Sequence, residues 1–294
     1  MFDLEGFIMP MTAYEVLHPD RNLSCVVFAS PHSGRDYAAS FLRRSILDEH
    51  AIRSSEDAFV DQLFDCAPRY GASFIKAGAP RAYIDLNRAP EELDPSVIEG
   101  IPRQGHNPRV ASGLGVIPRV VANGRAIYRG KLSQEEAQLR IDSYWRPYHS
   151  KLQELLTRAH RRHGQAVLVD CHSMPHEAMD GVACSGMRRP DVVLGDRFGA
   201  AAGGEVVDRI EAAFVDAGFI VTRNSPFAGA YITQAYGRPS RGQHAVQVEI
   251  DRALYMNERL IRPNGAFEAV EAALQRVVAD VAQIGQERLP LAAE

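Results

Sequence analysis

The chain has 294 residues, of which 46% are apolar and 24% are charged, and its formal net charge at pH 7 is −4. This composition is typical of a soluble globular protein, and the length predicts one domain over residues 1–294 with a sizeable core. The slightly negative charge excludes a general affinity for polyanions, so nucleic acid is not an expected partner. We find neither a basic-then-apolar leader nor the ~18 consecutive apolar residues of a membrane helix, and we expect a cytoplasmic protein without a membrane partner.

Four cysteines occur in the chain: Cys25, Cys66, Cys171 and Cys184. None belongs to a Cys-x-x-Cys pair, and two of them lie in apolar stretches that read as strands. This pattern predicts buried free thiols in a reducing compartment and argues against a structural cysteine-zinc site.

The first half of the chain predicts short elements around a buried strand. Residues 1–22 are mixed and are expected to wrap an edge of the fold, whereas residues 24–29 are apolar throughout, as in a strand buried on both faces. The other elements expected in this half are helices at 37–49 and 57–70 and paired strands at 73–77 and 82–86. Residues 89–131 are rich in Pro, Gly and Arg and predict a long irregular loop, which in a compact domain is usually functional or an insertion.

The second half alternates strands with helices. Ser133 and Glu136 form a capping-box pattern that predicts the start of a long helix reaching about residue 162. The elements expected after it are strands at 165–171, 191–196, 218–223 and 245–251, helices at 203–217 and 264–284, and a glycine-rich loop at 224–244. This alternation predicts an α/β fold with a mixed, mostly parallel central sheet and helices on both faces.

A histidine follows each of two predicted strands. His32 comes just after the strand at 24–29, and His172 directly follows the strand at 165–171. Ligands bind at the carboxyl ends of strands in open α/β sheets. We therefore expect the two histidines to lie close together and either to bind a metal or to transfer a proton. Asp170 points the same way as His172 because strand side chains alternate, and it is a candidate for orienting that ring behind a metal. The alternatives are a hydrogen-bonded loop histidine at His32 and a self-satisfied Asp170–His172 pair.

Two carboxylates complete a candidate catalytic set. Asp57 lies at a predicted helix start, where acidic residues are favoured by the helix dipole alone, but it is also a candidate third metal ligand. Two imidazoles and one carboxylate leave a fourth position for water, as in catalytic zinc sites. In the strand at 245–251, Gln247, Glu249 and Asp251 alternate with apolar residues and therefore face either water or a site. Glu249 is the candidate general base.

Arginines near glycines or amides suggest an anion pocket. In the stretch from Arg81 to Arg88, Asp85 and Asn87 share a face and Arg88 follows directly. Arg241 lies in a second, glycine-rich stretch that lets the backbone approach a small anion. The planar fork of arginine grips a carboxylate with two hydrogen bonds, although arginines in surface turns remain the alternative.

Taken together, these residues resemble the N-formylglutamate amidohydrolase family over about residues 25–256. The segments that carry the resemblance are Pro31-His32-Ser33-Gly34, Asp57, Asp85-Leu86-Asn87-Arg88, Trp145-Arg146-Pro147-Tyr148-His149, Asp170-Cys171-His172-Ser173, Ile232-Thr233, Tyr236-Gly237, Arg241-Gly242 and Glu249. The family is distantly similar to zinc carboxypeptidases and aspartoacylase, which implies a zinc-carboxypeptidase-like sheet of the phosphorylase/hydrolase type.

The resemblance also implies roles for individual residues. The implied cofactor is Zn²⁺ or another divalent metal held by His32, Asp57 and His172, with Glu249 as the catalytic base. The implied partner is a small-molecule N-acyl amino acid, bound by Arg81, Asn87, Arg88, Tyr236 and Arg241.

The most specific function implied is the hydrolysis of N-formyl-L-glutamate to formate and L-glutamate, a step of amino-acid catabolism. Two positions depart from the expected pattern. Arg35 stands three residues after His32, where zinc carboxypeptidases carry the Glu of a His-x-x-Glu motif, and Tyr231 stands where we expect histidine in histidine-degrading members. The alternatives are an amidase or carboxypeptidase for another N-acyl amino acid or small peptide, and a metal-free carboxylate-binding protein.

Overall fold

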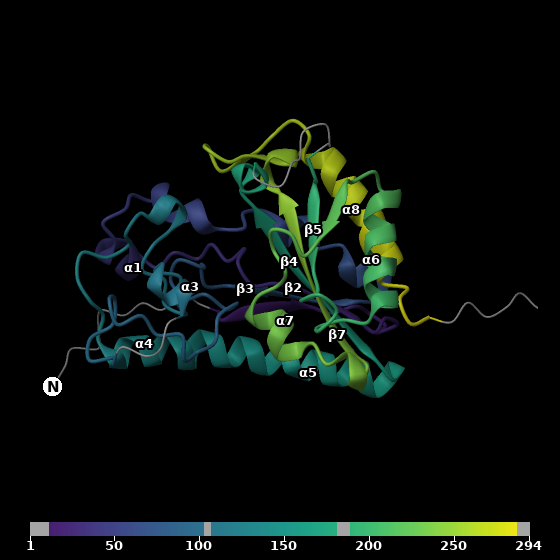
Figure 1. Ribbon diagram of the computed structural model, residues 1–294, viewed down its shortest axis with the longest axis horizontal. Coiled ribbons are helices and arrows are strands. Elements are labelled where there is room, and N and C mark those ends of the chain that lie inside the picture. Colours follow the sequence, from purple (N-terminus) through teal and green to yellow (C-terminus); the bar gives the residue numbers. More distant parts are fainter. Residues whose placement is uncertain (1–11, 103–106, 181–188, 287–294) are drawn as a thin grey trace, which may run out of the picture.

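The structure, a computed structural model, describes residues 12–102, 107–180 and 189–286 (Figure 1). Within these ranges seven strands form one sheet in the order β1-β3-β2-β4-β7-β5-β6. The strands are β1 (Tyr14–Leu17), β2 (Val26–Ser30), β3 (Ser73–Ala77), β4 (Ala166–Met174), β5 (Val192–Gly195), β6 (Val221–Arg223) and β7 (Gln243–Asp251). The four central strands β3, β2, β4 and β7 are parallel, β1 is antiparallel to β3, and β5 is antiparallel to β7 and parallel to β6. The predicted mixed, mostly parallel sheet is therefore confirmed.

Helices cover both faces of this sheet. They are α1 (Ala39–Arg44), α2 (Val60–Leu63), α3 (Pro108–Ala111), α4 (Gln134–Arg140), α5 (Arg146–His163), α6 (Gly204–Asp216), α7 (Tyr231–Tyr236) and α8 (Phe267–Val281). Figure 1 shows α6 beside α8 at the right of the sheet and α5 along its lower side. A small ribbon of β8 (Met256–Asn257) and β9 (Arg262–Pro263) precedes α8.

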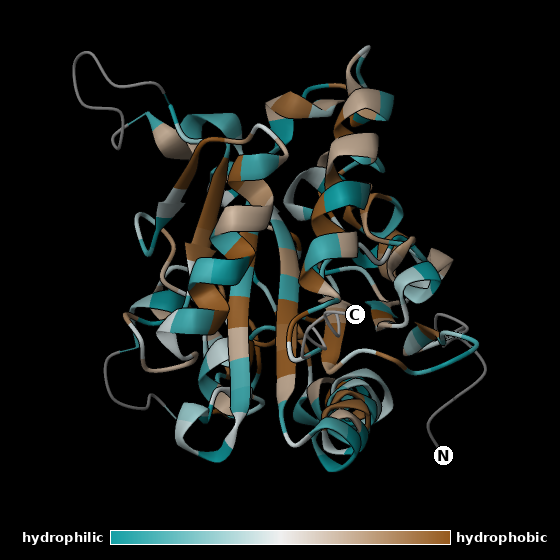
Figure 2. Cartoon of the chain, turned by 90° about the vertical axis from the view of Figure 1, so that its right-hand side faces the viewer, coloured by the Kyte–Doolittle hydropathy of each residue, from teal (hydrophilic) through white to brown (hydrophobic). Residues whose placement is uncertain are grey.

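Strand β2 shows why the central strands are apolar throughout. Val26 and Phe28 belong to the core that contains residues of α2, α6 and α8, whereas Val27 and Ala29 belong to the core beneath α5. Because both faces of the strand are buried, every position favours an apolar side chain. Figure 2 shows the result as brown, apolar strands between helices that turn teal, polar residues outward.

Three of the expected elements differ from the structure. The stretch 82–86 is no strand: the N–H groups of Tyr83 and Ile84 both donate to the carbonyl of Pro80, which makes a turn. All five of its residues are buried in a loop, which gives the stretch the apolar composition of a buried strand. The helix expected at 37–49 is reduced to α1, and the helix expected at 57–70 is reduced to α2 and a separate 3₁₀ turn at Ala67–Tyr70.

Two other expectations are confirmed, the capped helix start at Ser133 and the burial of free thiols at three of the four cysteines. The hydroxyl of Ser133 accepts from the N–H of Glu136 at 3.2 Å and caps α4, which continues through a π-helical turn at Ile141–Trp145 into α5. Cys25, Cys66 and Cys171 are buried and free, and Cys184 lies outside the described residues. In the described part of the chain, no helix has both the length and the apolar character that crossing a membrane requires.

Candidate active site

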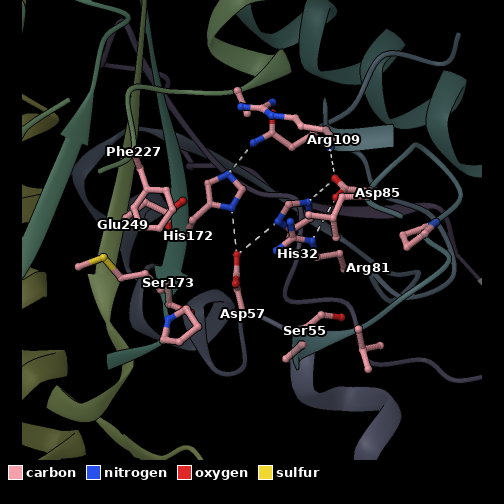
Figure 3. A pocket seen from close by; sticks show the side chains of 18 of the residues that line it. His32, Ser55, Asp57, Arg81, Asp85, Arg109, His172, Ser173, Phe227 and Glu249 are labelled. Atoms are coloured by element: carbon pink, nitrogen blue, oxygen red, sulfur yellow. Dashed lines mark hydrogen bonds and ion pairs between the residues drawn. The ribbon is translucent and has the colours of Figure 1, made fainter. Parts of the chain in front are cut away.

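The candidate site lies where the parallel strands end at one edge of the sheet. The chain places β3 on one side of β2 and β4 on the other, so the crevice between β2 and β4 is a topological switch point. His32 follows β2 by two residues, and His172 lies near the end of β4. The centroids of the two rings are 4.7 Å apart, so the structure brings together the histidines of two separate strands (Figure 3).

Asp57 is a third buried candidate metal ligand beside this pair. One ligand atom from each of His32, Asp57 and His172 can be chosen so that all three atoms lie within 4.8 Å of one another. The Oδ2 atom of Asp57 is 2.9 Å from Nδ1 of His172 and 3.4 Å from Nδ1 of His32. Asp57 does not begin a helix, since it lies three residues before α2. Its N–H instead donates to the carbonyl of His32 at 3.0 Å, which ties the two segments together.

A carboxylate lies behind each imidazole. Nε2 of His32 is 2.7 Å from Oδ1 of Asp85, and Nε2 of His172 is 3.0 Å from Oδ2 of Asp170. A ring that donates its Nε2–H to a carboxylate presents the lone pair of Nδ1, and in both rings Nδ1 faces Asp57. The side-by-side placement expected for Asp170 and His172 is thus present. Sequence reasoning missed the contact of Asp85 with His32 because it joins residues 53 positions apart.

This donor set fits a metal ion. Nδ1 of His32 is buried and has no hydrogen-bond partner among the described residues, although buried polar atoms are nearly always paired. Two imidazole nitrogens and one carboxylate oxygen are ligands that suit zinc and similar divalent ions. His32, Asp57 and His172 are therefore a candidate metal centre, which we call the ligand trio.

Arg252 holds the second oxygen of Asp57. Its Nη2 donates to Oδ1 of Asp57 at 2.9 Å, and its Nε donates to the hydroxyl of Ser173 at 3.1 Å. Burial opposes ionisation of Asp57, but its interactions with the imidazoles of His172 and His32 hold its pKa well below the usual value. Sequence reasoning missed Arg252, and its only local signal is its position directly after the strand that carries Glu249.

Glu249 lies beside the ligand trio on β7. In the β4–β7 register Glu249 pairs with His172, and neighbouring residues of parallel strands share a face. Burial is the main cause that raises the pKa of Glu249 to about 7. Gln247 donates from Nε2 to Oε1 of Glu249 at 2.8 Å, while its own Oε1 accepts from the N–H of Ala230 at 3.0 Å. This second bond fixes which end of the amide faces Glu249.

Asn87 and Arg88 are buried at the same edge. Asn87 accepts at Oδ1 from the N–H of Ile232 at 2.8 Å and donates from Nδ2 to Asp170 at 3.4 Å, so it connects α7 to the carboxylate behind His172. Arg88 donates from Nε to the carbonyl of Leu114 at 2.8 Å and from Nη1 to the carbonyl of Asn87 at 2.7 Å. These bonds fix the guanidinium of Arg88 at the wall of the cavity.

A cavity of about 490 Å³ contains the ligand trio and Glu249 (Figure 3). The predicted residues Arg81, Asn87 and Arg88 line it, and so do Arg109 and Arg252, which sequence reasoning did not single out.

The residues that line this cavity do not include Tyr236 or Arg241, so the substrate contacts expected for these two residues stay predictions. The stretch predicted as a loop contains α7, and its last residue, Tyr236, contacts Nδ1 of His149 on α5 through its hydroxyl, at 2.9 Å. Arg241 is exposed in the 3₁₀ turn Pro239–Arg241. Tyr231 packs against Trp145 and His149, outside the cavity as well.

A site of this composition at the switch point of such a sheet places the protein among hydrolases of the α/β class. The family model described as N-formylglutamate amidohydrolase matches residues 24–256. The chain is 30% identical over 284 residues to the N-formylglutamate deformylase of Pseudomonas aeruginosa. The aligned region covers 93% of this chain and 98% of that protein. The chain therefore belongs to the N-formylglutamate amidohydrolase family, as the motifs indicated, and it is an amidohydrolase.

Two further relatives agree with this assignment. The N-formylglutamate deformylase of Pseudomonas putida is 30% identical over 240 residues, covering 79% of this chain and 82% of that protein. The crystal structure of N-formylglutamate amidohydrolase from Ralstonia eutropha JMP134 is similar with a TM-score of 0.86 and 33% identity, covering 92% of this chain and 97% of that one.

Proposed function

We propose that this enzyme hydrolyses N-formyl-L-glutamate to formate and L-glutamate, and that it does so with one divalent metal ion, most simply Zn²⁺. The observation that carries the proposal is the convergence of His32, Asp57 and His172 beside Glu249 in a cavity lined by arginines. The similarity to the N-formylglutamate deformylases of both Pseudomonas species supports the choice of N-formylglutamate.

The ligand trio would hold the metal through Nδ1 of His32, Nδ1 of His172 and Oδ2 of Asp57. When bound, such an ion polarises the scissile carbonyl as a Lewis acid and lowers the pKa of water. Asp85 and Asp170 orient the two rings for this role, because each accepts a hydrogen bond from the nitrogen that faces away from Asp57.

Glu249 is the proposed general base. It accepts a proton from the attacking water and passes it to the nitrogen of the leaving glutamate, so that the amide bond breaks with a neutral amine as leaving group. Gln247 holds the carboxylate of Glu249 in place from one side.

Two of the cavity arginines have separate roles in this proposal. Arg81 is anchored through Nε to Oδ2 of Asp85 at 3.1 Å, next to the ligand trio, and it stabilises the negative charge that develops on the formyl oxygen. Arg88 is buried beside Asn87 and binds the α-carboxylate of the substrate.

Formate release from N-formyl-L-glutamate tests the proposal directly. The purified enzyme is stripped with a chelator, and the assay is repeated after zinc is added back. We expect the stripped enzyme to lose activity and zinc to restore it. Full activity after verified metal removal would contradict the metal-dependent mechanism, and the absence of formate from the zinc-loaded enzyme would contradict the substrate.

A further inference from the structure

The substrate of the proposed function carries two carboxylates, and the inference below rests on that function. Four arginines line the cavity: Arg81, Arg88, Arg109 and Arg252. Arg252 is bonded to Asp57 and Ser173, and Arg81 is bonded to Asp85. Two guanidinium groups, those of Arg88 and Arg109, thus have no carboxylate partner within the described residues.

The backbone of Leu114 links the backbone of Arg109 to the side chain of Arg88. Leu114 donates its N–H to the carbonyl of Arg109 at 2.8 Å and accepts at its own carbonyl from Nε of Arg88 at 2.8 Å. Asn107 caps the start of α3, and its Oδ1 accepts from the N–H of Arg109 at 3.0 Å. These bonds hold the base of the Arg109 side chain in a fixed relation to Arg88.

The two guanidinium groups are close enough for their charges to interact. Burial is the main cause that lowers the pKa of Arg88; the negative charges of Asp85 and Glu92 oppose this shift, and the positive charges of Arg81 and Arg109 add to it. A region of a cavity where like charges repel one another favours the binding of an anion.

Burial distinguishes the two arginines. Arg88 is buried and adjacent to Asn87, which contacts Asp170 behind the ligand trio, whereas Arg109 lines the same cavity and is exposed. The α-carboxylate of an N-formyl amino acid is separated from the scissile nitrogen by a single carbon, so it must lie deep in the cavity. The side chain of the substrate extends away from the metal centre, toward the rim.

We propose that Arg109 is the specificity-determining residue, which binds the side-chain carboxylate of the substrate while Arg88 binds the α-carboxylate. The enzyme then selects N-formyl derivatives of acidic amino acids over those of neutral ones. Arg109 takes the role that the sequence pattern assigned to Arg241, which lies outside the cavity.

The test compares N-formyl-L-glutamate with N-formyl-L-glutamine, which has nearly the same shape but a neutral side chain. In Arg109→Met we expect kcat/KM for the glutamate substrate to fall about 10- to 100-fold, the range for a lost hydrogen bond to a charged group, mainly through a higher KM. The value for the glutamine substrate should stay close to that of the wild type. Arg109→Lys should retain part of the preference, because it keeps the charge and loses the fork.

Arg241→Met is the matched control, since it removes an exposed arginine from outside the cavity. It should leave the ratio of kcat/KM for the two substrates unchanged. An unchanged ratio of the two kcat/KM values in Arg109→Met, whether or not both values fall, overturns the inference. So does a loss of preference in Arg241→Met with none in Arg109→Met. A wild-type enzyme that releases no formate from N-formyl-L-glutamate defeats the proposed function instead, so the two failures are distinguishable.

Discussion

Asp85 accepts a hydrogen bond from Nε2 of His32 at 2.7 Å, and this contact orients a ring that follows the end of β2. Asp85 also accepts from the backbone N–H of Asn87 at 2.8 Å and from Nε of Arg81 at 3.1 Å, so its two oxygens are held from three directions. The carboxylate therefore positions both a proposed metal ligand and the proposed oxyanion-stabilising arginine. This double role makes Asp85 a sensitive position although it does not face Asp57.

Replacing Asp85 by Ala is expected to weaken zinc binding about 10- to 100-fold, as is typical when the partner behind a ligating histidine is removed. The ring of His32 would no longer be held in the orientation that points Nδ1 at Asp57. Competition with a chromophoric chelator measures the affinity without any activity assay. An affinity equal to that of the wild type would show that the His32–Asp85 contact does not position the ligand.

The buried pair of Arg252 and Asp57 predicts a large effect on folding. Arg252→Met leaves Oδ1 of the buried Asp57 carboxylate without its guanidinium partner, and the metal-free protein should lose about 3–5 kcal/mol of unfolding free energy. Denaturant unfolding of the chelator-stripped protein measures the difference. The control is Arg146→Met, which breaks an exposed Arg146–Asp142 pair at a similar distance of 2.7 Å and should change stability by less than about 1 kcal/mol. Equal losses in the two variants would refute the special role of the buried pair.

Glu249→Gln should reduce turnover by about 10²- to 10⁴-fold, the usual range for loss of a general base. The glutamine side chain keeps the shape and cannot accept the proton from water. Zinc content, measured by elemental analysis on the same preparation, is expected to remain at the wild-type level. If the metal is lost together with the activity, Glu249 acts as a ligand and its assignment as the base is wrong.

His149 predicts acid sensitivity of the fold. Burial lowers its pKa to about 4, from an ordinary value of 6.5 that the unfolded chain retains. Below pH 6.5 the unfolded state therefore binds more protons than the folded state, and stability falls as the pH drops toward 4, by up to about 3 kcal/mol. The variant His149→Gln lacks this titration, so the stability advantage of the wild type should shrink between pH 7 and pH 4.5 in urea unfolding. A pH-independent difference would mean that His149 titrates normally in the folded protein.

The proximity of the two histidines of the ligand trio was predictable because it follows from a local pattern, whereas Asp57 was assigned only through the family resemblance. Polar residues that follow an apolar, doubly buried strand must lie at the carboxyl edge of a parallel sheet, and this rule alone predicts that His32 and His172 lie near each other. The alternation in β7 likewise identifies Glu249 as facing a site or solvent. These inferences need only strand periodicity and the geometry of parallel sheets.

The contacts that were missed depend on long-range packing. Arg252 meets Asp57 across 195 positions of the chain, and no local pattern encodes that distance. Arg109 lines the cavity 21 positions after Arg88, and the two are linked only through the backbone of Leu114. Conversely, Arg241 lies near glycines in a stretch that resembles an anion-binding loop, but α7 packs on α5 and carries that stretch away from the cavity.

The central claim is that His32, Asp57 and His172 share one ion, and anomalous diffraction from crystals of the zinc-loaded protein tests it most directly. The account predicts a zinc peak at about 2.0–2.2 Å from Nδ1 of both histidines and from one oxygen of Asp57. A peak bonded to Nε2 of either ring, a peak at another place in the chain, or no peak at saturating zinc would contradict it.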